Sequence, residues 1–562
     1  MLCGVVRRQV HTPRAPNVEE RSQTVSWTNR SMNVEATLAN AAWFTASIPE
    51  WLRYRQAASS VEETQNQLLA HYLRQNAVTE FGRAHDFERI HDWREYAERV
   101  PIRTYDDFHP WIERIAMGSP GVLTAERVDL LQPSSGSSGP EKWVPYTKTL
   151  QAEFRRAVAV WMTQNFMNDP GLMGGRAYWS LTPQSARKDT SKSQVPVGFD
   201  EDSAYLGSIA QRLIDMTLVT RPALQQISDM DLFWRASLLL LLKCKDLRLI
   251  SAWHPSYIML LLQHLRSGWR HLLADLYSGL TLTTPHLHIG PDPERATKLE
   301  SVDPSDPSDI WPELRLISCW GDGHAGGCID EVQSCFPEVK IQPKGLVATE
   351  AFATLSLDEY KPLAIRSHFF EFLDDDGKIH PAWDLDRGVV YSLIVTTGGG
   401  LYRYRMQDRV EITDYYREVP SLRFLGKEDN ISDFYGEKLA EAFVASVLSA
   451  IFDRHGLLPQ FAMLAMDESG TSPGYALYVQ CKDAIPVQMG VHLESELRRN
   501  PHYDLCIRLG QLRPVRVVPI ATEAYEVYSQ RMMDRGMRLG DIKPTPLSRF
   551  ADWSCHFAGS VT

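Results

Sequence analysis

A repeated pentapeptide is the feature that most restricts how this chain folds. The residues Leu-Arg-Leu-Ile-Ser occupy positions 247–251 and recur at 314–318, and in both copies a tryptophan follows two positions later, as Trp253 and Trp320. Short apolar runs followed by a loop are typical of buried strands. The first copy leads through Pro255 into an apolar helix face, which indicates a βα unit. We therefore predict two equivalent buried strands of a largely parallel sheet, and no repeat array, because the sequence holds no third copy.

The length of the chain requires more than one domain. Single hydrophobic cores stop growing near ~250–300 residues, and this chain has 562. With 44% hydrophobic and 23% charged residues, the composition excludes a disordered or fibrous protein. The net charge of −11 provides no broad basic surface, which argues against nucleic acid as a partner.

Cysteine spacing and hydropathy bear on the compartment. The eight cysteines contain no CxxC pair, so we expect reduced thiols in a cytoplasmic protein. The longest aliphatic run, Leu238–Leu242, is far shorter than the ~20 apolar residues of a membrane span, so none is expected. Residues 1–31 carry several arginines and weakly resemble a transit peptide, but Glu19, Glu20 and a second methionine at Met32 favour a flexible tail or an upstream start site.

Elements with helical and strand periods follow one another along the chain. Ser60 and Glu63 predict a capping box ahead of an apolar helix face. Residues 128–147 predict a strand, a loop and a second strand. Apolar residues with helical spacing begin again at Phe154. Beyond about residue 425 the pattern changes, with strands expected at 461–466, 475–481 and 515–520 and a helix at 488–499.

These patterns predict an α/β protein with two folded domains. We expect a large N-terminal domain, residues 32–425, with mixed and parallel sheets flanked by helices, and a small α+β C-terminal domain, residues 430–562. The short charged run Gly426–Asp429 between them suits a hinge.

The segment from Ser134 to Lys142 has the composition of an anion site. Its nine residues include four serines, two glycines and a lysine. Glycine lets backbone N–H groups turn toward an anion, hydroxyls donate further hydrogen bonds, and lysine adds positive charge, so the run suits phosphate oxygens. It is not a Walker loop, because Lys142 does not directly follow Gly139 and no helix opens there. The simpler alternative is a flexible Gly/Ser loop.

The order of residues in this run resembles the phosphate loop of the adenylate-forming superfamily. Later segments resemble the superfamily's adenine motif, ribose segment and hinge in the same order, at Gly345–Glu350, Tyr402–Asp408 and Phe424–Glu437. Within it, the sequence is most similar to the Gretchen Hagen acyl acid-amido synthetases. Four further segments carry that similarity, which extends from about residue 60 to about residue 550: Asn76–Arg83, Val100–Tyr105, Gly399–Arg405 and Asp541–Pro544.

The resemblance implies a role for each matching residue. It implies that Lys142 and the residues Ser134, Ser135, Gly136, Ser137, Ser138 and Gly139 surround the ATP phosphates, and that Val347, Ala348 and Thr349 contact adenine. It also implies that Glu350 holds Mg²⁺, that Asp408 accepts hydrogen bonds from the ribose hydroxyls, and that Lys543 meets the carboxylate and the α-phosphate. At Leu346 many superfamily members have an aromatic residue that stacks on adenine, so only apolar contact is expected there.

Without the resemblance, simpler interpretations apply to the same residues. Glu350 is then a solvated acid at a strand end, Asp408 forms a surface salt bridge to Arg405 or Arg409, and Lys543 is solvent-exposed. For six other side chains a structural role is the better interpretation. Large aromatic residues that could line an acid pocket are more often part of the core, which applies to Trp179, Trp320 and Phe352. Three histidines lack metal-ligand spacing: His254, His324 and His368.

The family resemblance implies an ATP-dependent ligase that uses Mg²⁺. It would convert a carboxylic acid into an acyl-adenylate and pyrophosphate, then transfer the acyl group to an amine, usually an amino acid, with release of AMP. An acyl-CoA ligase with the same first half-reaction is one alternative, and a nucleotide-binding or scaffold protein without catalysis is another. The sequence leaves the acid, the amine and the oligomeric state open.

Overall fold

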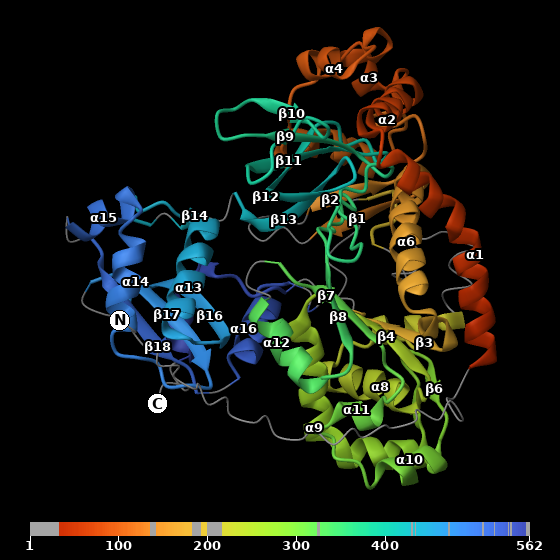
Figure 1. Cartoon of the computed structure of the whole chain (residues 1–562), viewed down its shortest axis with the longest axis vertical. Coiled ribbons are helices and arrows are strands. Elements are labelled where there is room, and N and C mark those ends of the chain that lie inside the picture. The colour runs from red at the N-terminus through yellow and green to blue at the C-terminus, as the bar shows by residue number, and fades with distance from the viewer. Residues whose placement is uncertain are drawn as a thin grey trace, which may run out of the picture. The chain divides into compact units, whose positions relative to one another are not determined.

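The computed structural model describes most of the chain between residues 33 and 557 (Figure 1). The described ranges are 33–134, 142–181, 193–198, 216–322, 326–428, 431–432, 434–469, 472–508, 511–521, 523–537, 539 and 542–557. The predicted tail, residues 1–31, lies outside them.

A four-stranded parallel sheet contains both copies of the pentapeptide. Its order is β3 (Arg176–Trp179), β4 (Leu247–Ser251), β7 (Leu316–Trp320), β8 (Lys340–Lys344). The two copies are neighbours in register, since Leu249 pairs with Leu316 and Ser251 with Ser318. The predicted βα unit is confirmed by α9, which begins at Pro255. The helices that accompany this sheet are α8 (Met230–Lys243), α9 (Pro255–Ser278), α10 (Pro293–Leu299), α11 (Pro307–Ile310) and α12 (Gly326–Cys335).

A five-stranded antiparallel sheet lies next along the chain. Its strands, in spatial order, are β10 (Ile379–Pro381), β9 (Phe369–Leu373), β11 (Val390–Thr396), β12 (Tyr404–Tyr416) and β13 (Val419–Lys427). Residues of β12 alternate between buried and partly buried positions, as expected for a strand with one face on a core. Its buried set begins Tyr404, Met406, Asp408, Val410.

N-terminal helices and one hairpin pack around that sheet. The helices are α1 (Val34–Ala57), α2 (Val61–Asn76), α3 (Glu80–Ala84), α4 (Trp93–Arg99), α5 (Tyr105–Ala116) and α6 (Lys148–Asn168), and the hairpin strands are β1 (Leu130–Ser134) and β2 (Lys142–Tyr146). The predicted helix after Ser60 is confirmed, but the predicted capping box is wrong. The Ser60 side chain makes no capping hydrogen bond, and its φ of −160° and ψ of 60° depart from usual N-cap angles.

The C-terminal part has its own mixed sheet, in the order β18 (Arg513–Pro519), β17 (Gly474–Cys481), β16 (Pro459–Asp467), β19 (Leu547–Ser548). Its helices are α13 (Glu441–His455), α14 (Met489–Leu497), α15 (Pro501–Arg508), α16 (Ala524–Asp534) and α17 (Trp553–Phe557). The strands and the helix predicted between 461 and 520 are thereby confirmed, as is the α/β class of the whole fold. The remaining short elements are β5 (Leu280–Leu282), β6 (Leu287–Ile289), β14 (Ile431–Ser432), β15 (Leu439–Ala440), η1 (Phe87–Arg89), η2 (Pro170–Gly174) and η4 (Pro222–Gln226).

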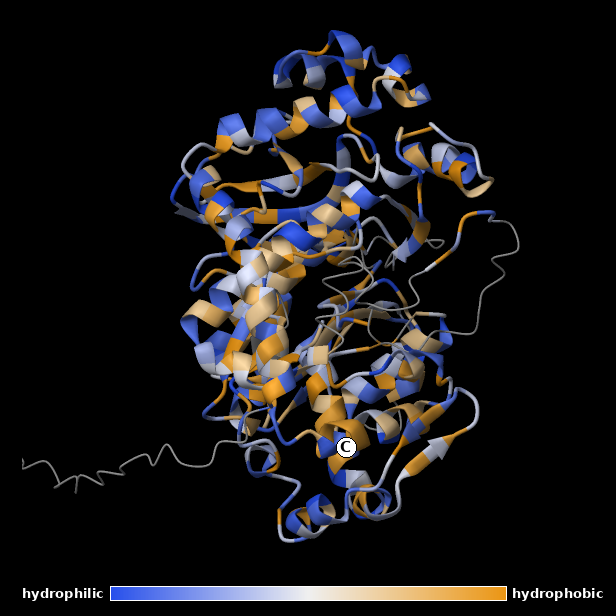
Figure 2. Cartoon of the chain, turned by 90° about the vertical axis from the view of Figure 1, so that its right-hand side faces the viewer, coloured by the Kyte–Doolittle hydropathy of each residue, from blue (hydrophilic) through white to orange (hydrophobic). Residues whose placement is uncertain are grey.

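The predicted hinge begins inside a strand. Gly426 and Lys427 are the last two residues of β13, Glu428 follows it, and Asp429 lies outside the described residues. The domain boundaries therefore stay predictions. Within the described ranges no helix is long and apolar enough to cross a membrane, and the helices in Figure 2 carry a mixture of hydrophobic and hydrophilic residues.

Candidate active site

The hairpin of β1 and β2 fixes both ends of the serine-rich run. Ser134 ends β1, Lys142 begins β2, and the two are partners in the antiparallel ladder. The Lys142 ammonium lies 5.6 Å from the centre of the Tyr105 ring. The residues between them include Ser135, Gly136, Ser137, Ser138 and Gly139, which lie outside the described residues, so their contacts with phosphate remain predictions.

The turn that contains Glu350 lies beside the end of β1. Ser134 Oγ donates to Glu350 Oε1 at 3.2 Å, and the Tyr146 hydroxyl on β2 donates to the Thr349 carbonyl oxygen at 2.7 Å. The turn is closed by a backbone bond from Ala348 N–H to the Ala351 carbonyl oxygen at 2.9 Å. The predicted metal ligand and the first residue of the predicted phosphate run are therefore direct neighbours. All four predicted site residues of the turn are partly exposed: Val347, Ala348, Thr349 and Glu350.

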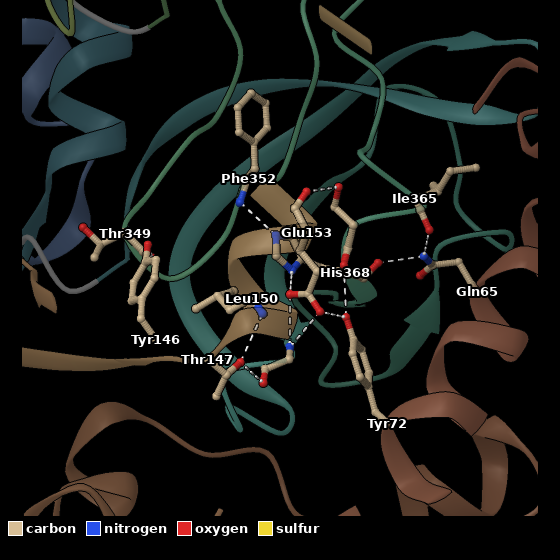
Figure 3. A network of polar contacts seen from close by, with 12 residues as sticks. Gln65, Tyr72, Tyr146, Thr147, Leu150, Glu153, Thr349, Phe352, Ile365 and His368 are labelled. Atoms are coloured by element: carbon tan, nitrogen blue, oxygen red, sulfur yellow. Dashed lines mark hydrogen bonds and ion pairs between the residues drawn. The ribbon is translucent and has the colours of Figure 1, made fainter. Parts of the chain in front are cut away.

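A buried polar network fixes the backbone next to the turn that contains Glu350 (Figure 3). His368 Nε2 accepts the Phe352 N–H at 3.0 Å, and His368 Nδ1 lies 3.0 Å from Glu153 Oε2. The Glu153 carboxylate also accepts the Gly398 N–H at 3.0 and 3.1 Å and the Tyr72 hydroxyl at 2.6 Å. Glu153 and His368 are fully buried. Since a buried charge is tolerated only when it is paired and hydrogen-bonded, this network anchors the turn to α2 and α6.

Leu346 does not present its side chain to a ligand. It is 5% exposed and packs in the core of the N-terminal helices and antiparallel sheet, while its N–H donates to Thr354 Oγ1 at 2.7 Å. The expected apolar contact between Leu346 and adenine is therefore not supported, because the side chain is directed into the core.

Asp408 is buried, and it forms its ion pair with neither Arg405 nor Arg409, the partners expected for a surface position. The side chain is almost fully buried, and Lys427 Nζ on the neighbouring strand lies 2.6 Å from Oδ1. Arg405 pairs with Glu428 at 2.7 Å, and Arg409 pairs with Asp375 at 2.6 Å. Strand alternation explains the difference, because it turns Asp408 inward and both arginines outward.

The electrostatic environment of Asp408 links residues distant in sequence. Burial raises the pKa of the Asp408 carboxyl, the nearby Lys427 ammonium lowers it, the Glu350 carboxylate raises it, and the Lys543 ammonium lowers it. Lys543 is exposed as a residue, but its ammonium lies 4.4 Å from the centre of the Trp320 ring at the carboxyl end of β7. The sequence-predicted residues Glu350, Asp408 and Lys543 therefore share one electrostatic environment.

Lys344 was not predicted from the sequence and lies at the same place. It ends β8, and its ammonium donates to Ser251 Oγ and to the Ala252 carbonyl oxygen, both at 2.9 Å. Burial, with a smaller contribution from Lys543, lowers the pKa of Lys344 to about 8. The available signal was its position at the carboxyl end of a parallel strand, where ligands of open α/β sheets bind.

The other aromatic and histidine side chains considered earlier have structural partners. Trp320 is 7% exposed and contacts Phe424 edge to face at 5.3 Å, and Phe352 contacts Phe154 at 6.1 Å. Trp179 is partly buried beside a small apolar cluster. His254 Nδ1 accepts the Ser256 N–H at the start of α9. His324 lies outside the described residues.

The described residues were compared with the ligand set that a magnesium ion uses. Among them, no three His, Cys, Asp or Glu side chains are grouped as metal ligands. Mg²⁺ commonly takes one or two carboxylates, keeps several waters and binds substrate phosphates, so the single partly exposed Glu350 carboxylate is compatible with it.

Sequence comparison identifies the family. Residues 52–341 match the GH3 family N-terminal domain, residues 361–427 the GH3 family central domain and residues 442–552 the GH3 family C-terminal domain. The chain belongs to the GH3 family. The resemblance found in the sequence is thus confirmed. The candidate site of this GH3 chain draws on all three matched segments, through Ser134 and Lys142, through Asp408 and through Lys543.

This chain is similar to known GH3 proteins over most of their length. The indole-3-acetic acid-amido synthetase GH3.4 of Arabidopsis thaliana is 23% identical, with 89% of this chain and 93% of the relative covered. The probable indole-3-acetic acid-amido synthetase GH3.12 of Oryza sativa subsp. japonica is 24% identical, with coverage of 77% and 79%. The solved GH3.15 acyl acid amido synthetase in complex with 2,4-DB has a TM-score of 0.78 at 19% identity, covering 91% of this chain and 96% of that one. The chain therefore has the fold of a GH3 acyl acid amido synthetase.

Proposed function

We propose that this GH3 protein is an ATP-dependent acyl acid-amido synthetase. It adenylates a carboxylic acid to acyl-AMP and pyrophosphate, then transfers the acyl group to an amine, most simply an amino acid, and releases AMP. Its relatives carry names that describe amide formation with an acyl acid.

One observation carries the proposal. Ser134, Glu350, Asp408 and Lys543 come from four distant parts of the chain. Ser134 is hydrogen-bonded to Glu350, and the charges of Glu350 and Lys543 both act on the pKa of the Asp408 carboxyl. Residues with purely structural roles have no reason to bring two carboxylates and a lysine from distant parts of the chain to one place. The arrangement suits a nucleotide whose ribose meets Asp408 and whose phosphates lie toward Ser134 and Glu350.

The first half-reaction has an electrostatic barrier that these residues address. An acid at neutral pH is an anion, and it must attack the negatively charged α-phosphate of ATP. We assign Lys142 and Lys543 to the neutralisation of this charge, with N–H and hydroxyl groups of the serine-rich run on the other phosphates. Removing one preorganised donor of this kind typically costs ~2.7–4 kcal/mol, or about 10²–10³ in rate.

Glu350 is the residue that we assign to Mg²⁺. When bound, the ion would neutralise phosphate charge in the manner of a Lewis acid. The hydrogen bond from Ser134 Oγ orients the Glu350 carboxylate before any ligand arrives. The His368 network fixes the backbone of the same turn.

The second half-reaction needs room for the amine. We propose that residues 430–562 move as a small domain about Gly426–Asp429 against residues 32–425, which withdraws Lys543 and opens the acyl-adenylate to attack. We further propose a cytoplasmic location, because every cysteine whose side chain the structure describes is a free thiol and disulfides persist in oxidising compartments.

The test is ATP–pyrophosphate exchange across a panel of carboxylic acids, followed by mass detection of products with amino acids and with CoA. We expect exchange that depends on one class of acid, and an amide plus AMP when the amino acid is added. Thioester formation with CoA in place of the amide would favour an acyl-CoA ligase, and no exchange with any acid would refute adenylation.

A further inference from the structure

Lys344 is a partly buried lysine whose ammonium has no carboxylate partner among the residues that the structure describes. Its contacts are two neutral oxygens, Ser251 Oγ and the Ala252 carbonyl, and the ring of Trp253, whose centre is 5.2 Å away. Within the described part of the chain, no carboxylate pairs with it. Its titratable neighbours are the Cys319 thiol on β7 and the Lys543 ammonium. A partly buried cation with only neutral and cationic neighbours is costly to the protein unless something else supplies the negative charge.

The surroundings of Lys344 match a ligand with an apolar body. Trp253 and Trp320 follow the two pentapeptides at equivalent positions, and the backbone N–H of Trp320 donates to the Trp253 carbonyl oxygen at 3.1 Å. Lys344 lies against the Trp253 ring, and Lys543 lies against the Trp320 ring at 4.4 Å. The Trp253 side chain is 41% exposed, which is unusual for a large aromatic at the end of a buried strand. Trp320 is buried against Phe424, so Trp253 is the indole ring that is exposed beside the two cations, and this combination complements a molecule with an apolar surface and one anionic end.

We infer that Lys344 binds the carboxylate of the acid substrate, together with Lys543. This inference rests on the proposed function. The phosphates of ATP are assigned to Ser134, Lys142 and Glu350, and none of these three contacts Lys344. Its one cationic neighbour is Lys543, the residue expected at the reacting carboxylate and the α-phosphate. A carboxylate between the two ammonium groups is therefore the reacting group of the acid.

The two hydrogen bonds of Lys344 make it a prepared site. An ammonium has three donors, and Ser251 and Ala252 hold two of them in fixed directions. The acid therefore meets an oriented positive charge, and less side-chain entropy is lost on binding. Lys344 belongs to β8, so it stays with the acid when the C-terminal part carrying Lys543 moves.

The test measures ATP–pyrophosphate exchange, which reports the first half-reaction without an amine. The variants are Lys344→Met, Lys344→Arg and the matched control Lys340→Met, an exposed lysine at the start of the same strand. We expect Lys344→Met to raise the KM for the acid about tenfold or more, with the KM for ATP changed less than about twofold, because it loses a hydrogen bond to a charged group. Lys344→Arg should recover part of the loss, and Lys340→Met should behave as the wild type.

The pH profile gives a second readout that a purely structural role would not change. Only the protonated ammonium attracts a carboxylate, so kcat/KM for the acid in the wild type should fall as the pH rises through about 8, the pKa of Lys344 in the free protein. The Lys344→Met variant should lack this fall, and Lys344→Arg should show it only at higher pH.

Four outcomes would overturn the inference. The first is an unchanged KM for the acid in folded Lys344→Met. The second and third are a rise confined to the KM for ATP and a rise confined to the KM for the amino acid in the complete reaction. The fourth is the same dependence of kcat/KM on pH in wild type and Lys344→Met. Exchange by the wild type in the presence of an acid shows that the proposed function holds, so the four outcomes then bear on Lys344 alone. If the wild type shows no exchange with any acid, both the proposed function and the role of Lys344 are refuted.

Discussion

The unpaired ammonium of Lys344 should make the stability of the protein depend on pH in a way that one substitution removes. In the folded chain burial lowers the pKa of Lys344 to about 8, from an ordinary value of 10.5. Below pH 8 both the folded and the unfolded chain carry this proton, and the folded state bears the full cost of the buried charge. Between pH 8 and 10.5 the folded chain loses the proton first, so the wild type regains stability as the pH rises.

The magnitude follows from the two pKa values. A difference of 10.5 − 8, or 2.5, corresponds to a ceiling of ~3.4 kcal/mol at 1.36 kcal/mol per pKa unit. Between about pH 7.0 and about pH 9.5 only the interval from pH 8 to pH 9.5 contributes, which limits the change to ~2 kcal/mol at 1.36 kcal/mol per pKa unit. The side chain is partly buried, so solvent screening acts in the same direction, and we expect ~1–2 kcal/mol. Lys344→Met removes the charge but also leaves Ser251 Oγ and the Ala252 carbonyl without their donor, at ~1 kcal/mol each. Those losses are the same at every pH, so the change with pH isolates the charge.

Differential scanning calorimetry of wild type, Lys344→Met and Lys340→Met at about pH 7.0 and about pH 9.5 measures this pH dependence of stability. Unfolding entropy of ~2 cal/mol/K per residue over several hundred residues converts ~1–2 kcal/mol into roughly 1–2 °C. The difference in Tm between Lys344→Met and wild type should be more positive at the lower pH than at the higher pH by that amount. Lys340→Met should have the Tm of the wild type at both pH values. An identical Tm difference at both pH values would show that Lys344 carries no buried charge, and the reasoning would fail.

The other predictions concern the residues assigned to the nucleotide. Lys543→Ala should lower the exchange rate by about 10²–10³ while ATP still binds by calorimetry, and a normal rate would remove Lys543 from the mechanism. Glu350→Gln should weaken the Mg²⁺ dependence of exchange, and an unchanged metal titration counts against its role. Asp408→Ala should raise the KM for ATP more than that for the acid, and the reverse order would mean that the ribose assignment is wrong.

Local patterns in the sequence were sufficient to predict the α/β class and several individual elements of the fold. The pentapeptide predicted two equivalent buried strands, and the structure pairs Leu249 with Leu316 on neighbouring strands. The strand, loop and strand around Ser134 and Lys142 were predicted because apolar residues and turn residues separate clearly there. Such elements depend on nearby residues, which a sequence displays directly.

Features that depend on distant residues could not be predicted in the same way. The ion pair of Asp408 with Lys427 arises because β13 lies against β12, and only the ladder register brings those two residues together. Leu346 matches an aromatic position of the superfamily, but its side chain is directed into the core by surrounding packing. Lys344 has no local motif, and its properties come from Ser251 at the end of β4, from Ala252 directly after it, and from burial.

The ion pair between Asp408 and Lys427 has a thermodynamic consequence for the order of events. Lys427 is the end of β13 and also part of the proposed hinge. On the proposed assignment, ribose hydroxyls that engage the Asp408 carboxylate would compete with the Lys427 ammonium at Oδ1, so an occupied nucleotide site would weaken this ion pair at the end of β13. Linkage is reciprocal, so rotation about Lys427 must change nucleotide affinity by the same factor. On this proposal, the movement that admits the amine and the departure of AMP would be two effects of one equilibrium.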